Sequence, residues 1–214
     1  MTKTKIAIFP IPNCITFPGT VMPLHVFEPR YRDMVNYCLE NDMPLAVCHT
    51  QKVVREIEPS NNLEEMLGGN ASTYKPFSVF SAGRCELLET TDDGRIMLNV
   101  HLQQRYHLLN EVQTLPFTIA QCEPVFDDEL AHETLTLAEQ AQEKILMRLL
   151  AITHSHPEVA TLLQSEPWRL KTPVEFSFEI LGILQFEAED MQDLLEMTDS
   201  LQRLESILAL INKG

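Results

Sequence analysis

Two short groups of residues have side chains that could do chemistry. Cys48-His49 could supply a nucleophile and its base, and His154-Ser155-His156 could bind a metal ion. Each group also fits a structural role, which the sequence favours. Cys48 and His49 stand at the end of an expected strand, as a buried thiol beside an edge imidazole would. The two histidines near position 155 follow an expected helix, where a histidine interacts well with the helix dipole.

The motifs of nucleotide binding and hydrolysis do not occur. None of the seven glycines is followed by lysine, so there is no phosphate-binding loop, and neither G-x-S-x-G nor G-x-G-x-x-G is present. The segment HETLT, from His132, begins like the zinc motif H-E-x-x-H but has Thr136 at the second ligand position. We therefore predict no catalytic residue, no metal site and no cofactor.

Composition and charge narrow the class of protein. Apolar residues make up 44% of the 214 residues, which is typical of a globular chain, and no run of 18 apolar residues could cross a membrane. The formal net charge is −15, with 17 acidic and 6 basic residues after position 124, and such a surface repels phosphate groups. We expect no nucleic acid and no membrane among the partners, whereas basic polypeptides would be attracted.

The cysteines and the N-terminal residues indicate the cellular compartment in which the protein works. The five cysteines are odd in number, widely spaced and without a C-x-x-C pair, so free thiols in a reducing compartment are expected. The first residues, MTKTKIAIFPIPNC, have too short an apolar run for a signal peptide. A cytoplasmic location is therefore predicted.

The first half of the chain has the pattern of short strands. Apolar and mostly polar residues alternate over residues 95–103, which places Ile96, Leu98, Val100 and Leu102 on one face of a strand. The strand follows Asp93-Gly94, a pair typical of hairpin turns. Further strands are predicted in the segments KIAIF, LHVF, LAVCHT, FSVFSAGRCELLE and PFTIAQCEP, one helix after Pro29, and a mobile loop over residues 56–73.

The second half has a helical pattern. Helices are expected in the segments DDELAHETLTLAEQAQEKILMRLLAITH, PEVATLLQS, EDMQDLLEM and DSLQRLESILALINK. Thr172-Pro173-Val174-Glu175 is a capping box that should open another helix, ending near Gln185. Trp168 should anchor the helical core. The sequence thus predicts a β-rich subdomain over residues 1–123 and a helical bundle over residues 124–214.

Five prolines between Phe9 and Pro29 mark short strands that end in turns. Proline lacks an N–H group and so occurs at strand starts, sheet edges and turns. Pro18-Gly19 fits the centre of a type II turn, where glycine supplies the positive φ. We interpret this stretch as strands that wrap a small barrel filled by their apolar neighbours.

The same stretch resembles a known family. The spacing of Phe9-Pro10, Phe17-Pro18-Gly19, Pro23 to Glu28, and Arg30-Tyr31 is similar to the opening signature of the Lon N-terminal, or substrate-binding, domain. The segment ETTDDGRIMLNVHLQQRYHLLN resembles the central hairpin of that family, and QDLLEMTDSLQRLESILALI resembles its closing helices. Here Gly83 is displaced from the family's usual glycine position before the hairpin, and Gln103-Gln104 replace a small residue.

The resemblance implies a fold and a function. The expected fold is α+β: a PUA-like pseudo-barrel of about six mainly antiparallel strands with one helix, followed by a helical bundle. The expected function is non-catalytic binding of unfolded or exposed polypeptide segments, as an adaptor or a holdase-like binder. An RNA-binding PUA-like protein and a small-molecule enzyme of unknown type are the alternatives. The candidate binding residues are Phe17, Pro18, Met22, Leu24, His25, Phe27, Glu28, Arg30 and Tyr31.

Overall fold

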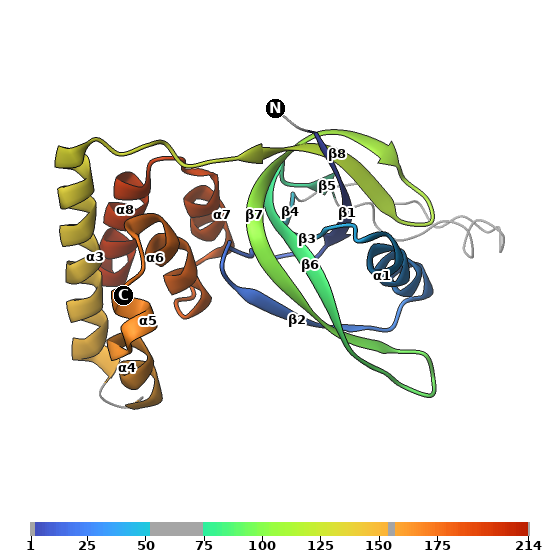
Figure 1. Ribbon diagram of the computed structural model, residues 1–214, viewed down its shortest axis with the longest axis horizontal. Coiled ribbons are helices and arrows are strands. Elements are labelled where there is room, and N and C mark those ends of the chain that lie inside the picture. Colours follow the sequence, from blue (N-terminus) through green and yellow to red (C-terminus); the bar gives the residue numbers. More distant parts are fainter. Residues whose placement is uncertain (1–2, 52–74, 154–156, 214) are drawn as a thin grey trace.

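The computed structural model describes residues 3–51, 75–153 and 157–213. These residues form an α+β fold, in which a barrel of strands with one helix stands beside a bundle of helices (Figure 1). The loop expected over residues 56–73 and the pair His154 and His156 lie outside the described residues. No helix in the described ranges is both long and apolar enough to cross a membrane.

The barrel is a six-stranded sheet that closes on itself. Its strands are β1 (Thr4–Pro10), β2 (Val21–Val26), β3 (Leu45–Cys48), β6 (Val79–Thr90), β7 (Ile96–Gln113) and β8 (Thr118–Val125). They lie in the order β2-β7-β6-β3-β1-β8, and a further β7–β8 pairing completes the closure. Only the β1–β3 pair within this sheet is parallel, so the prediction of a mainly antiparallel barrel is confirmed. A separate pair is formed by β4 (Thr50–Gln51) and β5 (Lys75–Pro76).

Strand β7 is longer than predicted and pairs with two different strands along one of its edges. Its first half pairs with β2 and its second half pairs with β8. The four apolar residues predicted to share a face, Ile96 to Leu102 at alternate positions, are all buried. The strand was expected to end at Gln103 but continues to Gln113, because pairing with β8 sustains it after the burial alternation has faded.

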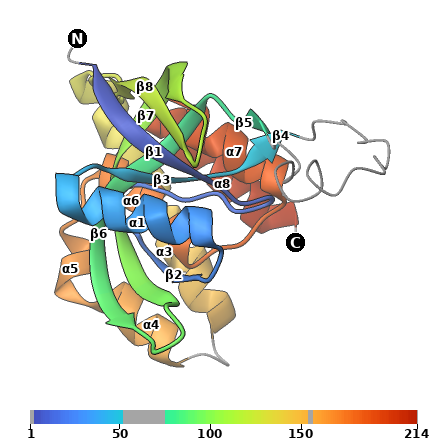
Figure 2. The ribbon, with the colours of Figure 1, turned by 90° about the vertical axis from the view of Figure 1, so that its right-hand side faces the viewer.

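Helix α1 (Pro29–Asn41) packs against the barrel and begins at proline as predicted. It buries Met34, Val35 and Cys38 in the barrel core. The view from the barrel side shows α1 lying across the sheet (Figure 2). Predicted turns at Pro18-Gly19 and Asp93-Gly94 are present, since both glycines have positive φ values of 80° and 78°.

The bundle contains six α-helices in the described part of the chain: α3 (His132–Ile152), α4 (Pro157–Gln164), α5 (Glu166–Arg169), α6 (Pro173–Glu179), α7 (Ala188–Glu196) and α8 (Ser200–Lys213). The capping box is confirmed, because the side chains of Thr172 and Glu175 each accept a backbone N–H of the other residue. Helix α6 ends at Glu179 and continues only as the 3-10 turn η2 (Ile180–Gly182), short of the predicted Gln185. Helix α5 was not predicted; it holds the buried Trp168, whose ring contacts Phe176 edge-on.

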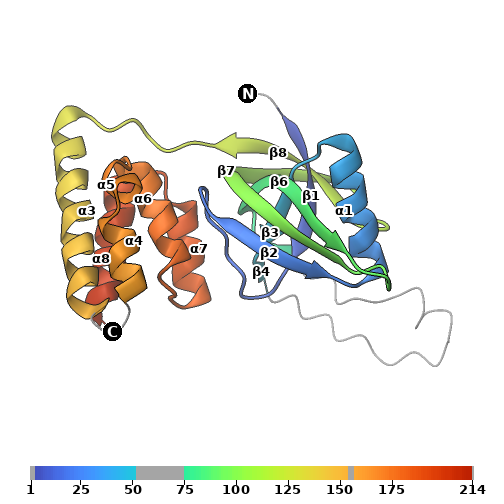
Figure 3. The same cartoon turned by 60° about the horizontal axis from the view of Figure 1, so that its bottom comes forward.

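The barrel and the bundle share part of one core. Phe17, from the barrel half of the sequence, is only 2% exposed and belongs to the core cluster of the bundle. Residues 126–131 connect β8 to α3 over the junction (Figure 3). The subdomain boundary expected after residue 123 stays a prediction, and β8 extends past it to Val125.

Candidate binding surface between barrel and bundle

Residues 11–20, which we name the strap, join the barrel to the bundle. The Thr16 hydroxyl donates a hydrogen bond to the carbonyl of Val47, and the Ser81 hydroxyl donates one to the carbonyl of Thr16. The Gly19 N–H donates to the Leu102 carbonyl, with 2.8 Å between nitrogen and oxygen. The strap is therefore fixed to the barrel by its backbone, while Phe17 lies in the bundle core.

Two glycines allow the strap to lie close to the bundle. A Cβ atom on Gly19 would come within 2.6 Å of the Glu179 side chain, and one on Gly182 would lie 3.2 Å from a methyl carbon of Thr20. Because Gly19 also has φ +80°, a side chain there would be strained as well as crowded. The strap and the α6–η2 segment are thus in close contact.

A buried group of charges connects the same two parts. The carboxylate of Asp127 accepts hydrogen bonds from the guanidinium groups of both Arg105, on β7, and Arg203, on α8. Arg105 also donates to the carbonyls of Leu195 and Met197, at 2.6 and 2.7 Å. We name Arg105, Asp127 and Arg203 the buried triad. It ties β7 to the α7–α8 region through residues far apart in the sequence.

The two arginines of the buried triad share an aromatic platform. Their guanidinium carbons lie 4.8 Å (Arg105) and 3.7 Å (Arg203) from the centre of the Phe178 ring. Burial lowers the pKa of Arg105 to about 10, and it lowers the pKa of Arg203 as well. Arg105 therefore stays charged at neutral pH, and its charge is stabilised by the Asp127 carboxylate, by the two backbone carbonyls and by the Phe178 ring.

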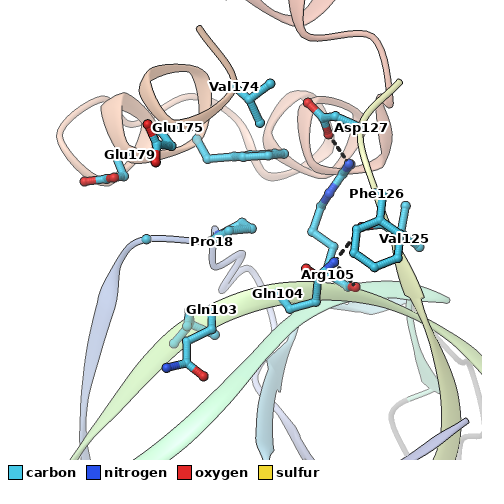
Figure 4. A pocket seen from close by; sticks show the side chains of 13 residues that line it. Pro18, Gln103, Gln104, Arg105, Val125, Phe126, Asp127, Val174, Glu175 and Glu179 are labelled. Atoms are coloured by element: carbon cyan, nitrogen blue, oxygen red, sulfur yellow. Dashed lines mark hydrogen bonds and ion pairs between the residues drawn. The ribbon is translucent and has the colours of Figure 1, made fainter. Parts of the chain in front are cut away.

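The smaller of two cavities at the junction lies between α6 and the strands. It has a volume of about 420 Å³ and occupies the place where β7 passes from β2 to β8. Figure 4 shows Val174, Glu175 and Glu179 on the helix side and Gln103, Val125 and Phe126 on the strand side. Phe126 is 62% exposed.

The larger cavity is lined by strap residues on both sides of Pro18-Gly19 in the sequence and has a volume of about 1010 Å³. Its barrel wall is residues 13–17 and 20–22, and its bundle wall is residues 181–189 with Met191. Apolar side chains from both walls face it: Ile15, Phe17, Val21, Met22, Ile183, Leu184, Phe186 and Met191.

The predicted binding residues do not form one surface. Phe17 and Met22 line the larger cavity and Pro18 lines the smaller one. Leu24 is buried in the barrel core, where its substitution would test packing rather than binding. The remaining predicted residues lie at the end of β2 and the start of α1: His25, Phe27, Glu28, Arg30 and Tyr31. Nothing in the geometry tests a binding role for any of them.

The group at the start of α1 is held by local contacts. Glu28 stands at the N-cap position, but its side chain makes no capping hydrogen bond and instead pairs with Arg30 at 3.0 Å. The Arg30 guanidinium lies over the Tyr31 ring, and that ring meets Phe9 edge-on. The Glu28 carboxylate is drawn to the nearby guanidinium and not to the N–H groups at the start of α1.

The Cys48-His49 pair is arranged as a structural element. Cys48 is buried, and burial raises the pKa of its thiol well above the ordinary value. The His49 ring stacks on Phe77, and its Nδ1 accepts a hydrogen bond from the Asn13 backbone at 2.9 Å. Within the described residues, no cluster of three or more His, Cys, Asp or Glu side chains could hold a metal ion.

Sequence reasoning missed the residues that shape the junction. Asp127 was expected at the start of a helix, but that helix begins only at His132. Phe126 and Glu187 lay in no expected element, and Glu189 was read as an acidic helix start. Arg105 and Arg203 were noted only as parts of family motifs. A phenylalanine followed by two aspartates after a strand is a weak signal, because nothing local says that the ring stays exposed while Asp127 becomes buried.

Comparison with known proteins identifies the family. Residues 5–213 match the family described as the ATP-dependent protease La (LON) substrate-binding domain. The chain belongs to this family. The resemblance stated for the sequence is thereby confirmed.

Relatives of this Lon family member are proteases several times its length. The chain is 26% identical to Lon protease 1 of Hydrogenovibrio crunogenus over 215 aligned residues, which cover 98% of this chain and 24% of that protein. It is 22% identical to the Lon protease of Cytophaga hutchinsonii over 96% of this chain and 24% of that protein. The chain thus spans about a quarter of the length of the curated relatives it matches.

Solved structures share its fold. A Lon N-terminal domain protein from Xanthomonas campestris aligns with a TM-score of 0.61 and 23% identity, covering 96% of this chain and 98% of that chain. The N-terminal domain of Lon protease from the Mycobacterium avium complex aligns with a TM-score of 0.68 and 13% identity, covering 99% and 100%. The α+β fold of a Lon N-terminal domain is thus established for this chain.

Proposed function

We propose that this Lon-family chain is a non-catalytic module that binds exposed segments of unfolded polypeptides, acting as an adaptor or a holdase-like binder. The family to which it belongs is described as a substrate-binding domain, which supports the recognition of polypeptide substrates. The chain covers only about a quarter of its protease relatives. The substrates that this chain binds, and the partner to which an adaptor would deliver them, are therefore parts of the proposal.

The observation that carries the proposal is the exposed Phe126 ring beside the smaller cavity. An apolar side chain of a bound segment could pack against Phe126, Val125 and Pro18, while the Gln103 amide could bond the backbone of the segment. Exposed aromatic rings beside a hollow are typical of binding surfaces rather than of structural positions. The rigid junction on both sides favours a preformed site.

The two alternatives receive less support from the same residues. For RNA, the formal net charge of −15 is unfavourable to phosphate groups, and the two arginines of the buried triad are already paired with Asp127. For an enzyme, the described charged residues of the smaller cavity all have structural partners: Arg105 and Asp127 in the buried triad, Glu175 in the capping box, and Glu179 with Lys171.

Two phenylalanines provide a matched test. Phe126 and Phe27 are 62% and 64% exposed, but only Phe126 lies at the junction. We expect Phe126→Ala to weaken binding of a permanently unfolded protein by about 2 kcal/mol, or about 30-fold in Kd. Phe27→Ala should leave the Kd nearly unchanged. The measurement is fluorescence anisotropy with reduced and carbamidomethylated lysozyme as the probe, at physiological salt.

The same titration distinguishes the surfaces and the functions. A loss confined to Phe27→Ala would move the site to the end of β2, among the residues predicted from the sequence. If the parent chain does not bind the probe at tens of micromolar, polypeptide binding is excluded. The probe should remain intact on a gel after the titration, because the proposed module does not cleave its substrate.

A further inference from the structure

Charge distinguishes the two cavities at the junction. Two acidic residues, Glu187 and Glu189, line the larger cavity, and no lysine or arginine is among the lining residues that belong to the described part of the chain. Both carboxylates are exposed, and neither makes a hydrogen bond or an ion pair within the described ranges of the chain. The walls of this groove combine apolar side chains with polar groups and the two exposed carboxylates, so the groove is complementary to a segment that carries both apolar residues and positive charge.

In the smaller cavity the acidic groups already have partners. Asp127 lies between two arginines, and Glu179 pairs with Lys171 at 2.7 Å. Glu175 is engaged in the capping box, where hydrogen bonds from Thr172 lower the pKa of its carboxyl. The smaller cavity therefore offers an apolar contact with little free charge.

His49 does not offset the acids of the larger cavity. Its imidazole is near Glu189, but burial lowers the pKa of His49, and its Nδ1 already accepts a hydrogen bond from the backbone. The ring is therefore neutral at neutral pH. Acidic residues at the start of a helix such as α7 are also favoured by the helix dipole. That role explains their presence, but it does not explain their place beside the apolar side chains that line the larger cavity.

We infer that the larger cavity is a second contact site for extended polypeptide segments in which lysine or arginine flanks apolar residues, with Glu187 and Glu189 selecting for the positive charge. The inference rests on the proposed polypeptide-binding function and deepens it. The larger cavity has a volume of about 1010 Å³, which is enough for several side chains. Residues of the strap line both cavities, Pro18 and Gly19 in the smaller one and residues 13–17 in the larger one, so a single extended segment could contact both.

The test uses three peptides with identical apolar residues and with lysine, glutamine or glutamate at the flanking positions. At low salt, the parent chain should bind the lysine peptide about fivefold more tightly than the glutamine peptide, the size expected for two exposed ion pairs. Glu187→Gln with Glu189→Gln should abolish that preference. The control is Glu139→Gln with Glu143→Gln, two exposed acids on α3, which lies at the far side of the bundle from the barrel (Figure 3).

Each outcome decides the inference. A preference for lysine that is lost in the Glu187/Glu189 double variant and kept in the Glu139/Glu143 double variant supports it. An equal loss in both double variants, or no preference in the parent chain, overturns it, because net charge alone would then explain the binding. If the preference is absent while binding of unfolded lysozyme still depends on Phe126, only this inference fails. If neither the peptides nor the lysozyme bind, the proposed function fails with it.

Discussion

Cys38 and Cys85 are the thiols whose chemistry depends most on a neighbouring residue. Cys38, on α1, is buried and shares a hydrogen bond with Cys85, on β6, which is partly exposed. The hydrogen bond from Cys38 lowers the pKa of Cys85, whereas the same contact and burial raise the pKa of Cys38. The thiolate is the reactive form, so Cys85 should be the more reactive of the two thiols.

Removal of the neighbouring thiol tests this arrangement. We expect Cys38→Ala to raise the pKa of Cys85 and to slow its alkylation near neutral pH by severalfold, since less thiolate is then present. The measurement is the pH dependence of iodoacetamide labelling at Cys85, followed by peptide mass mapping. Cys122, which is buried and whose pKa burial raises to about 12, should stay unlabelled in both proteins. An unchanged labelling midpoint for Cys85 would show that the hydrogen bond does not control it.

At the scale of elements, the β6–β7 hairpin depends on one glycine. The register shifts between Ala82 and Gly83, and a Cβ on Gly83 would come 1.6 Å from the His101 carbonyl oxygen on β7. Neither the Gly83 backbone nor the His101 carbonyl can move away without breaking the hydrogen bonds that pair β6 with β7. The glycine that is displaced from its usual family position is therefore required where it stands in this chain.

Two glycine variants should differ strongly in stability. Gly83→Ala should lower the free energy of unfolding by about 3 kcal/mol or more, because backbone lies in the way. Gly182→Ala should change it by less than about 1 kcal/mol, because the nearest neighbour is a Thr20 methyl carbon at 3.2 Å and not a backbone atom. Urea unfolding followed by circular dichroism measures both. Similar losses in the two variants would contradict the close approach of β6 to β7.

For the whole molecule, the connection of barrel and bundle depends on Phe17 and the buried triad. Arg105 and Arg203 are both fully or almost fully buried and share the one carboxylate of Asp127. Loss of that carboxylate would remove the hydrogen-bonded counter-charge of both buried guanidinium groups and leave only the weaker attraction of Asp128 for Arg105 and of Asp199 for Arg203. Removal of one partner from a buried ion pair typically costs several kcal/mol.

A pair of adjacent aspartates tests the role of the triad. Asp127→Ala should lower the free energy of unfolding by about 3 to 5 kcal/mol. Asp128→Ala should cost less than about 1 kcal/mol, because the Asp128 side chain is exposed and bonds only the Thr198 hydroxyl among the described contacts. Chemical unfolding, monitored by both circular dichroism and Trp168 fluorescence, measures the two variants. Equal effects would show that the triad is not a major link between the two parts.

The sequence determined the elements because their causes are local. Three features depend on neighbours within a few positions: the alternation of buried apolar residues from Ile96 to Leu102, the capping box at Thr172, and the turn glycines. All three are found as predicted. The spacing of the proline-rich stretch likewise was enough to indicate the family that residues 5–213 match.

Only the tertiary structure decided how these elements form a site. Arg105, Asp127 and Arg203 become one group, and Phe17 enters the bundle core, through packing between distant segments. The same packing places the Phe126 ring beside one cavity and Glu187 and Glu189 on the rim of the other. No local pattern contains these relations, because the burial and charge of each side chain are set by residues that the chain brings near it only when it folds.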